Sequence, residues 1–510
     1  MAGGSGMGFQ LTDEQRAIVE TQENRIAITA YAGTGKTATL KALSSSRPRE
    51  RILYLAFNKA MAEESRVLFA QCRNVEVRTI HSLAFKFEGN QFRDTLGEFK
   101  TLDIIPFLFP DCGKNRQKYY EPARDVHDTF IKWLTSSALS LTEFFKKTPF
   151  RTRSKETKAN VKKLWNACVK GKFSMPHNGY LKLFQINHRG EYLGFDRVMV
   201  DEAQDLNDCM IDAVMSRDWA VTLVGDPYQQ VYGFNGAVNA LGKAAEFGVS
   251  QYYLTHSFRC PQDVIFKANQ YLTLMGAVKE FTGVDKPKKA GPGRVLVLGR
   301  TNAGIFDMVA ETMETCAYHF NGGFDTYEFE ILLDMVRLIC GERVSHPFLK
   351  NFASSDDLEI YADSVNDFQT RTRLKIAKRY GNTIFGIYRD MRQLQAWKRD
   401  EADAVVSTVH KAKGQEAPHV EMLNDFLSLA EAIGRLQQLV AMDDAPNPRE
   451  TQQGTEVASF DMAKTMEEFR LLYVAITRTL GTLSIPPEYV INREAIDLFL
   501  ALAERGGFIR

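Results

Sequence analysis

The chain has 510 residues, a formal net charge of +1, and a composition that is 44% hydrophobic and 25% charged. These proportions are ordinary for a globular protein, and the length predicts several domains of ~150 residues each. No segment approaches the ~20 apolar residues of a membrane helix, so we expect no membrane partner. The small net charge neither favours nor excludes nucleic acid, because binding depends on local patches of charge.

The N-terminus and the cysteines indicate the cellular compartment of the protein. Residues 1–8 are glycine-rich and lack an apolar core, which indicates a flexible lead or tag remnant and not a signal peptide. The seven cysteines are odd in number and contain no CxxC pair, which argues against a disulfide framework or a zinc site. We therefore expect a reducing, intracellular compartment.

The first predicted element is a strand that runs into a glycine-rich turn. Residues 26–31 are apolar and β-prone, and a helix-compatible segment begins at residue 38. Backbone N–H groups of such a turn point at phosphates, and the helix N-terminus adds positive potential. In this P-loop pattern Lys36 reaches the β- and γ-phosphates of ATP and the Thr37 hydroxyl ligates Mg²⁺. The other turn residues assigned to the nucleotide are Ala32, Gly33, Thr34 and Gly35.

A basic run lies between residues 146 and 172. It contains ten Lys or Arg residues and one acidic residue, Glu156, with Phe150, Trp165 and Phe173 within or beside it. One interpretation is a surface for the phosphate backbone of DNA. The other is a solvated helical face, which a charge run alone favours by roughly two to one. The residues assigned to DNA in this run are Lys146, Lys147, Arg151 and Arg153.

A second apolar strand is predicted at residues 195–200, and it ends in Asp201 and Glu202. A strand that delivers two carboxylates at its tip is typical of a Walker B element. We expect Asp201 to hold Mg²⁺ and Glu202 to polarise the attacking water as a general base. The alternative, an exposed acidic turn, is disfavoured about ten to one once the P-loop is present.

A third predicted strand covers residues 220–226. Strands that alternate with helices indicate a parallel α/β sheet whose ligands bind at the strand ends. In the loop that follows, Gln229 is suitably placed to sense the γ-phosphate, and Tyr232 is assigned to DNA. Phe234 is predicted to stack on a base, worth ~1–3 kcal/mol, with a buried core phenylalanine as an equally weighted alternative.

From Leu11 to Arg478 the sequence resembles a superfamily 1 helicase of the UvrD-like kind, with the motifs in family order. The segment 11–15 resembles the Q motif, which implies that Gln15 reads adenine. Residues 257–259 resemble the motif in which an aromatic ring, Phe258, stacks on adenine and an arginine, Arg259, reaches the γ-phosphate. Residues 472–478 resemble the last motif, with Arg478 as a second γ-phosphate arginine.

The same resemblance implies contacts to DNA. Segments 56–59 and 79–82 resemble the DNA-contacting motifs of the first motor domain, and 300–302 resembles one of the second. Residues 407–416 resemble the motif that couples nucleotide to DNA, in which Gly414 and Glu416 are assigned to the nucleotide. The residues assigned to DNA in these motifs are Phe57, Asn58, His81, Arg300, Asn302 and His410.

Within the superfamily the sequence is most similar to the helicase part of the F-box DNA helicases, on the segments 177–185, 225–241, 253–259 and 407–416. This resemblance implies 3′-to-5′ movement on single-stranded DNA and removal of recombinase filaments. Only about ten residues precede the Q motif, so we expect no F-box and no ubiquitin-ligase scaffold partner. Further departures from the family pattern are Asn235, Ala417-Pro418 and Thr479-Leu480.

The resemblance predicts an α/β fold with two RecA-like P-loop motor domains, each carrying an insertion subdomain. The first motor domain is assigned to residues 9–87 and 180–251, with its insertion at 88–179. The second is assigned to 252–340 and 402–510, with a short insertion at 341–401.

These features predict an ATP- and Mg²⁺-dependent 3′-to-5′ DNA helicase or translocase, acting in repair, recombination control or replication. The expected partners are single-stranded DNA, forked or tailed duplexes, and recombinase filaments. We expect it in the nucleus of a eukaryote, or in the cytoplasm or nucleoid of a bacterium. Two alternatives remain: a translocase that strips bound proteins with little unwinding, and a non-enzymatic DNA-binding scaffold with a decayed ATP site.

Overall fold

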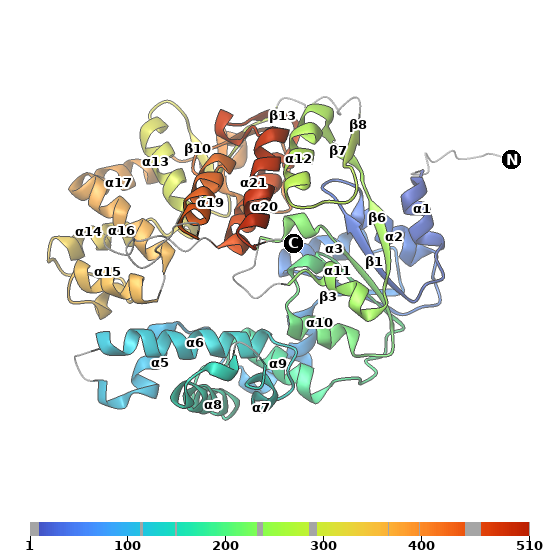
Figure 1. Cartoon of the computed structure of the whole chain (residues 1–510), viewed down its shortest axis with the longest axis horizontal. Helices are drawn as coiled ribbons and strands as arrows, with labels where there is room; N and C mark the ends of the chain where they lie inside the picture. Colours follow the sequence, from blue (N-terminus) through green and yellow to red (C-terminus); the bar gives the residue numbers. More distant parts are fainter. Residues whose placement is uncertain are drawn as a thin grey trace. The chain divides into compact units, whose positions relative to one another are not determined.

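The computed structural model describes residues 10–112, 116–147, 150–231, 238–284, 293–365, 367–396, 398–443 and 461–508. The chain divides into two compact units. The first consists of Met1–Tyr31, Gly35–Leu254 and Ile360–Asp367, and the second of Ala32–Thr34, Thr255–Glu359 and Phe368–Arg510. Each unit has its own parallel sheet (Figure 1).

In the described part of the first unit, six parallel strands form a sheet in the order β3-β2-β4-β5-β1-β6. The strands are β1 (Arg25–Ala30), β2 (Ile52–Ala56), β3 (Val75–Thr79), β4 (Arg197–Val200), β5 (Ala220–Gly225) and β6 (Ser250–Leu254). The apolar runs at 26–31, 195–200 and 220–226 are β1, β4 and β5, as the sequence predicts. Because every pair is parallel, the carboxyl ends of the strands meet at one edge.

Helices that follow the strands bury the apolar faces of this sheet. They are α1 (Asp13–Glu20), α2 (Lys36–Ser45), α3 (Lys59–Leu68), α4 (Ile80–Phe87), α10 (Asp208–Met215) and α11 (Ala240–Lys243). The core between them includes Ile28, Leu40, Tyr54 and Met199, all fully buried. Burial of such side chains supplies most of the free energy that holds the unit together.

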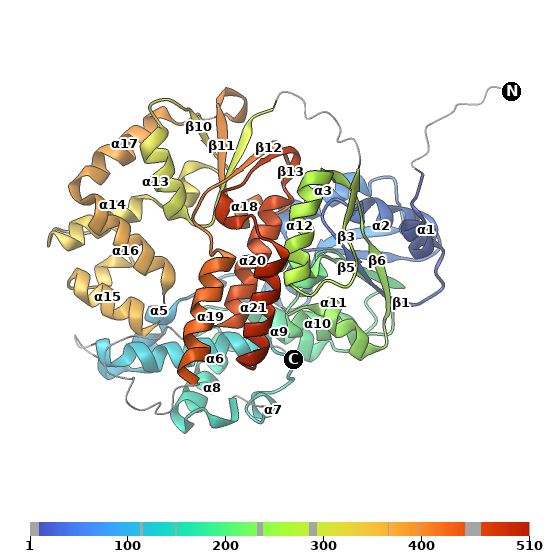
Figure 2. The same cartoon turned by 45° about the horizontal axis from the view of Figure 1, so that its top comes forward.

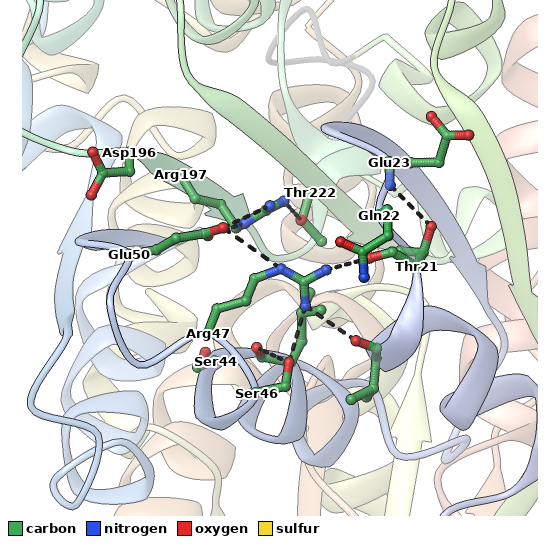
Figure 3. A network of polar contacts seen from close by, with 12 residues as sticks. Thr21, Gln22, Glu23, Ser44, Ser46, Arg47, Glu50, Asp196, Arg197 and Thr222 are labelled. Atoms are coloured by element: carbon green, nitrogen blue, oxygen red, sulfur yellow. Dashed lines mark hydrogen bonds and ion pairs between the residues drawn. The ribbon is translucent and has the colours of Figure 1, made fainter.

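The amino ends of the strands are tied by a polar network that we call the basal network: Arg47, Glu50, Arg197 and Thr222 (Figure 3). Arg197, the first residue of β4, is 2% exposed. Its guanidinium donates to both carboxylate oxygens of Glu50, at 2.6 and 3.3 Å, and to the hydroxyl of Thr222 at 3.4 Å. Arg47 donates to the backbone carbonyl oxygens of residues 19 and 21. The network therefore fastens α2 and the end of α1 to the sheet.

The α-helices between α4 and β4 form the first helical insertion (Figure 1). They are α5 (Thr101–Leu108), α6 (Tyr120–Thr135), α7 (Leu141–Phe144), α8 (Lys155–Val169) and α9 (His177–Asn187). The long helix α6 packs against α5, α8 and α9. Phe130 and Trp133 of α6 and Phe144 of α7 are buried in its core.

In the described part of the second unit, five parallel strands form a sheet in the order β10-β11-β9-β12-β13. They are β9 (Val295–Gly299), β10 (Tyr318–Phe320), β11 (Ala404–Thr408), β12 (Ala417–Met422) and β13 (Thr479–Ser484), and a separate parallel pair is formed by β7 (His256–Pro261) and β8 (Thr282–Val284). The predicted α/β fold with two parallel-sheet, RecA-like domains is therefore confirmed.

The helices of the second unit fall into two groups. The first comprises α12 (Gln262–Leu274), α13 (Asn302–Thr312), α18 (Val409–Ala412), α19 (Leu429–Asp443), α20 (Met462–Ile476) and α21 (Arg493–Arg505). Helix α12 packs against α20 and α21, and α19 packs against α21 (Figure 2). None of the helices in the described parts of the chain is both long and apolar enough to cross a membrane.

The second group lies between β10 and β11 and consists of α14 (Glu330–Ile339), α15 (Ser355–Ser364), α16 (Phe368–Tyr380) and α17 (Ile384–Leu394). Helix α14 packs against α16 and α17. The helical layer after β10 thus begins before residue 341, where the sequence places the start of the second insertion. The patterned segment before 341 gives no sign of this, because an amphipathic helix looks the same whether it covers a sheet or other helices.

Candidate nucleotide site and nucleic-acid contacts

The turn after β1 has the backbone that a phosphate-binding loop needs. Gly33 and Gly35 have φ values of 71° and 79°, in the left-handed region that side chains disfavour. Helix α2 begins directly after Gly35, so Lys36 and Thr37 lie in its first turn. The N-terminus of α2 therefore presents backbone N–H groups at the carboxyl edge of the sheet.

Two carboxylates from the end of β4 meet the lysine of this turn. Lys36 Nζ lies 3.0 Å from Glu202 Oε1, with both side chains mostly buried. Asp201 is 7% exposed, and its Oδ1 accepts from the backbone N–H of Glu202 at 2.9 Å. The structure thus brings together Lys36, Asp201 and Glu202, as the sequence predicts from two distant segments.

Glu202 has an unusual backbone for a residue with a side chain. Its φ is 52°, in the left-handed region. The bend turns the chain sharply after Asp201, so that both carboxylates point toward the P-loop lysine. Non-glycine residues in this region cost ~1–3 kcal/mol and concentrate at functional sites.

The electrostatics of the cluster favour an added cation. Burial opposes the charge of Lys36, but the carboxylates of Glu202, Asp201 and Asp226 outweigh it and raise the lysine pKa. Burial and the neighbouring Glu202 raise the pKa of Asp201. Three carboxylates therefore surround one ammonium. This surplus of negative charge fits Mg²⁺, which binds through one or two carboxylates together with phosphate oxygens.

Among the described residues, no group of three or more His, Cys, Asp or Glu side chains is arranged to hold a metal ion by itself. Asp201 and Thr37 are the residues that would hold Mg²⁺.

Gln204, which the sequence analysis does not assign, connects the ends of β4 and β5. Its amide nitrogen donates to Glu202, and its Oε1 accepts from the N–H of Asp226 at 3.0 Å. A Cβ at Gly225 would lie 2.0 Å from that oxygen, so only glycine allows this approach. Gln229 donates to Asp226 Oδ2 at 2.7 Å, which holds the proposed γ-phosphate sensor at the same edge.

Gln15 is held at the start of α1 by a reciprocal cap with Thr12. Its Oε1 accepts from the Thr12 N–H at 3.1 Å, and its own N–H donates to the Thr12 hydroxyl at 3.2 Å. The side chain is fully buried, and among the described residues its amide nitrogen has no hydrogen-bond partner. An unmet buried donor costs ~1–3 kcal/mol, and an acceptor atom of an adenine ring fits it.

The second unit gathers its predicted nucleotide residues in the same way. Arg259 donates to Glu416 and to the backbone oxygen of Thr477. Arg478 is 2% exposed, and its Nε donates to the Val474 oxygen at 3.0 Å. Three motifs that are far apart in the sequence therefore meet. Gly414, with φ 87°, supplies the turn before Glu416.

The tip of the P-loop, Ala32–Thr34, groups with this second unit. The Ser257 hydroxyl donates to the Ala32 oxygen at 2.9 Å, and the N–H of Phe258 donates to the Gly33 oxygen at 2.9 Å. The ring of Phe258 is 40% exposed. An exposed ring fixed beside the P-loop tip suits the predicted stacking on adenine.

Two departures from the family pattern meet on one rung of the second sheet. Ala417 and Thr479 pair in register between β12 and β13, and both are buried. The N–H of Ala417 donates to the backbone oxygen of Arg478 at 3.0 Å. The two changes are therefore a packing pair beside Arg478.

The predicted DNA residues of the first unit also have structural partners. Asn58, directly after Phe57, caps α3 by accepting from the N–H of Met61 at 2.9 Å. His81 Nε2 lies 3.2 Å from Asn178 Oδ1 on α9, and burial lowers the His81 pKa. Asn178 lies in the segment 177–185 that carries the family resemblance, which is the one signal for it in the sequence.

In the second unit, Arg300 forms a bidentate ion pair with Glu468, with a shortest distance of 2.6 Å. The half-buried Asp425 accepts from the N–H groups of Arg300 and Thr301 at 2.7 and 2.9 Å, and Asn302 donates to the Tyr327 oxygen at 3.2 Å. His410 lies in α18. The remaining DNA assignments, Tyr232 and Phe234, lie outside the described residues, as does Asn235.

The basic run occupies α8 and the segment before it. Lys146 and Arg151 are exposed, whereas Lys147 lies 3.5 Å from Glu143 and Arg153 lies 3.0 Å from Asp125. The aromatic residues beside the run pack inward: Phe150 stacks on Phe144, Trp165 meets Trp133 edge to face, and Phe173 packs at a tilt against Phe107. The aromatics therefore belong to the core of the insertion, while the charges form its surface.

A phosphate-binding turn, a strand-end carboxylate pair and two parallel sheets together define a P-loop nucleotide-binding protein. The family described as AAA domain matches residues 14–235.

Relatives extend the match to almost the whole chain. The chain is 29% identical to F-box DNA helicase 1 of Gallus gallus over 97% of its own length and 50% of that protein. It is 27% identical to F-box DNA helicase protein 1 of Schizosaccharomyces pombe over 92% of its own length and 56% of that protein. A 100-residue segment, 18% of the chain, is 30% identical to the probable DNA helicase II homolog of Mycoplasma genitalium.

The chain is therefore similar, over nearly its whole length, to the helicase part of the F-box DNA helicases. It spans about half the length of the two F-box relatives.

Proposed function

We propose that the protein is an ATP-dependent motor that moves 3′ to 5′ on single-stranded DNA and separates strands. The observation that carries this proposal is the Lys36–Glu202 pair beside Asp201, at the edge where the P-loop begins. A scaffold with a decayed ATP site has no need of three buried carboxylates around one lysine.

The described side chains support a division of labour in hydrolysis. Lys36 leaves Glu202 for the β- and γ-phosphates when ATP binds, because the phosphates carry more negative charge than one carboxylate. Glu202, thus released, accepts a proton from the attacking water. Gln229 orients toward the γ-phosphate from its bond with Asp226. Asp201 and Thr37 would hold Mg²⁺, which would supply charge stabilisation to the phosphoryl oxygens.

The second unit would complete the reaction. We propose that Arg259 and Arg478 stabilise the charge that develops on the transferred group, as arginine fingers do. Arg259 is now bound to Glu416, so the same exchange of a carboxylate for a phosphate applies to it. Hydrolysis then requires both units, and their alternating grip on DNA produces stepping.

DNA is proposed to contact Asn58, His81, Arg300, Asn302 and His410, with Tyr232 and Phe234 stacking on bases. The likeness to the F-box DNA helicases further suggests the substrates: we propose that the protein acts on forked or tailed duplexes and on recombinase filaments, in repair or recombination.

Strand displacement tests the proposal. Duplexes with a 3′ tail, a 5′ tail or no tail are incubated with the full chain, ATP and Mg²⁺, with the Glu202→Gln variant as the control. We expect displacement from the 3′-tailed duplex alone and none with the variant. Displacement from 5′ tails would overturn the polarity. DNA-stimulated hydrolysis without displacement would favour a translocase that strips proteins, and stimulation by RNA but not by DNA would overturn the substrate.

A further inference from the structure

The centre of β2 contains a polar group that the proposed reaction does not use. Tyr54 is fully buried in an otherwise apolar strand, and its ring packs against Phe69 with centroids 4.8 Å apart. A phenylalanine would fill the same space. The hydroxyl, however, donates to Asp201 Oδ2 at 2.6 Å, so its partner is the carboxylate assigned to Mg²⁺.

This bond completes the fixing of Asp201. Its Oδ1 accepts from the N–H of Glu202 at 2.9 Å and its Oδ2 accepts from Tyr54. Each oxygen therefore has one fixed donor, and the plane of the carboxylate is set before any ligand arrives. Outer partners of this kind orient a metal-binding carboxylate.

We propose that Tyr54 is a positioning residue that holds Asp201 in its Mg²⁺-binding orientation. This inference rests on the proposed function, since it assumes that Asp201 binds Mg²⁺ with ATP.

The test measures Mg²⁺ binding and not turnover. A fluorescent ATP analogue is titrated with MgCl₂ in the presence of the full chain, and the apparent Mg²⁺ dissociation constant is read from the fluorescence change. Tyr54→Phe should raise that constant about tenfold or more, the usual effect of losing an outer partner of a metal ligand. Analogue binding without Mg²⁺ should not change.

Tyr252→Phe is the matched control. Tyr252 lies on β6 of the same sheet, and its hydroxyl bonds to Thr21 at 2.8 Å, away from Asp201. It should keep the wild-type constant. If Tyr54→Phe and Tyr252→Phe behave alike while the wild type shows Mg²⁺-dependent binding, the inference fails and the proposed function stands. If the wild type itself shows no Mg²⁺-dependent binding, the proposed function fails.

Discussion

The two ends of the first sheet bury charge in opposite ways. At the amino ends, two arginines share one carboxylate: Arg197 donates to both oxygens of Glu50, and Arg47 lies 3.7 Å from Glu50 and also donates to backbone carbonyls. At the carboxyl ends, Asp201, Glu202 and Asp226 surround Lys36. The hydrogen-bonded partners of the first cluster hold elements together, whereas the surplus of carboxylates in the second favours an added cation. The amino-end edge of the sheet therefore contributes mainly to stability, and the carboxyl-end edge forms the candidate site.

The largest effect should come from breaking the carboxyl-end cluster. Glu202→Gln should reduce the kcat of ATP hydrolysis by ~10⁴, the upper end for loss of a general base, while still binding ATP. Lys36→Ala should abolish turnover by removing the phosphate contact. The thermal unfolding midpoint of Glu202→Gln should stay close to wild type, because Lys36 keeps Asp201 and Asp226 as carboxylate neighbours. Hydrolysis that persists in both variants would contradict the role assigned to this edge.

A somewhat smaller effect is expected from the arginines of the second unit. Arg259→Ala and Arg478→Ala should each lower kcat by ~10³, the lower end for arginine fingers, with little change in nucleotide affinity. Arg493→Ala, whose partner is the exposed Asp497, is the control and should be neutral. Steady-state ATPase assays decide this, and unchanged kcat in both variants would mean that the carboxyl-end cluster is catalytically complete by itself.

The amino-end network should respond in stability and not in rate. Arg197→Met leaves Glu50 without its bidentate partner, and we expect a loss on the order of 3 kcal/mol, the lower end for breaking a buried pair, because Glu50 is partly exposed. Thermal unfolding would measure the loss. The kcat per folded molecule at low temperature should equal that of the wild type. If Arg197→Met instead lowered kcat and left the thermal unfolding midpoint unchanged, the amino-end network would not be a purely stabilising feature.

The smallest effect concerns a third arrangement of charge, the exposed basic run. Neutralising Lys146, Lys147, Arg151 and Arg153 together should weaken binding to single-stranded DNA evenly across sequences and flatten its salt dependence by ~0.7 in log–log slope per lost contact. Basal ATPase should not change. Affinity measured across a salt series provides the test.

The structure sharpens this prediction. Lys146 with Arg151 should account for more of the change than Lys147 with Arg153, because the latter two already pair with carboxylates. Equal affinities and parallel slopes for the wild type and the quadruple variant would indicate an ordinary solvated face.

The sequence predicts the parts of the molecule that have a local signature. The strands at 26–31, 195–200 and 220–226, the glycine turn, and the meeting of Lys36 with Glu202 follow from apolar runs and from the fact that parallel strands end at one edge. The partner of Tyr54 does not follow, because it depends on register. Tyr54 pairs with Met199, two residues before Asp201, and nothing in the segment 52–56 predicts that alignment.

The hydrogen-bond and ion-pair partners of the proposed DNA-binding residues could not be predicted from the sequence either. The Arg300–Glu468 and His81–Asn178 contacts join segments about 170 and 100 residues apart. The inward packing of Phe150 and Trp165 was hidden for the same reason: a short aromatic-containing segment looks alike on a surface and in a core.

The left-handed backbone of Glu202 has a consequence for anyone who wishes to make the protein more robust. A screen for heat resistance would favour glycine at this position, since glycine adopts φ 52° without the steric penalty that a side chain carries there. The same replacement would delete the carboxylate proposed to activate water. Selection for heat resistance and selection for catalysis would therefore favour different residues at this one position.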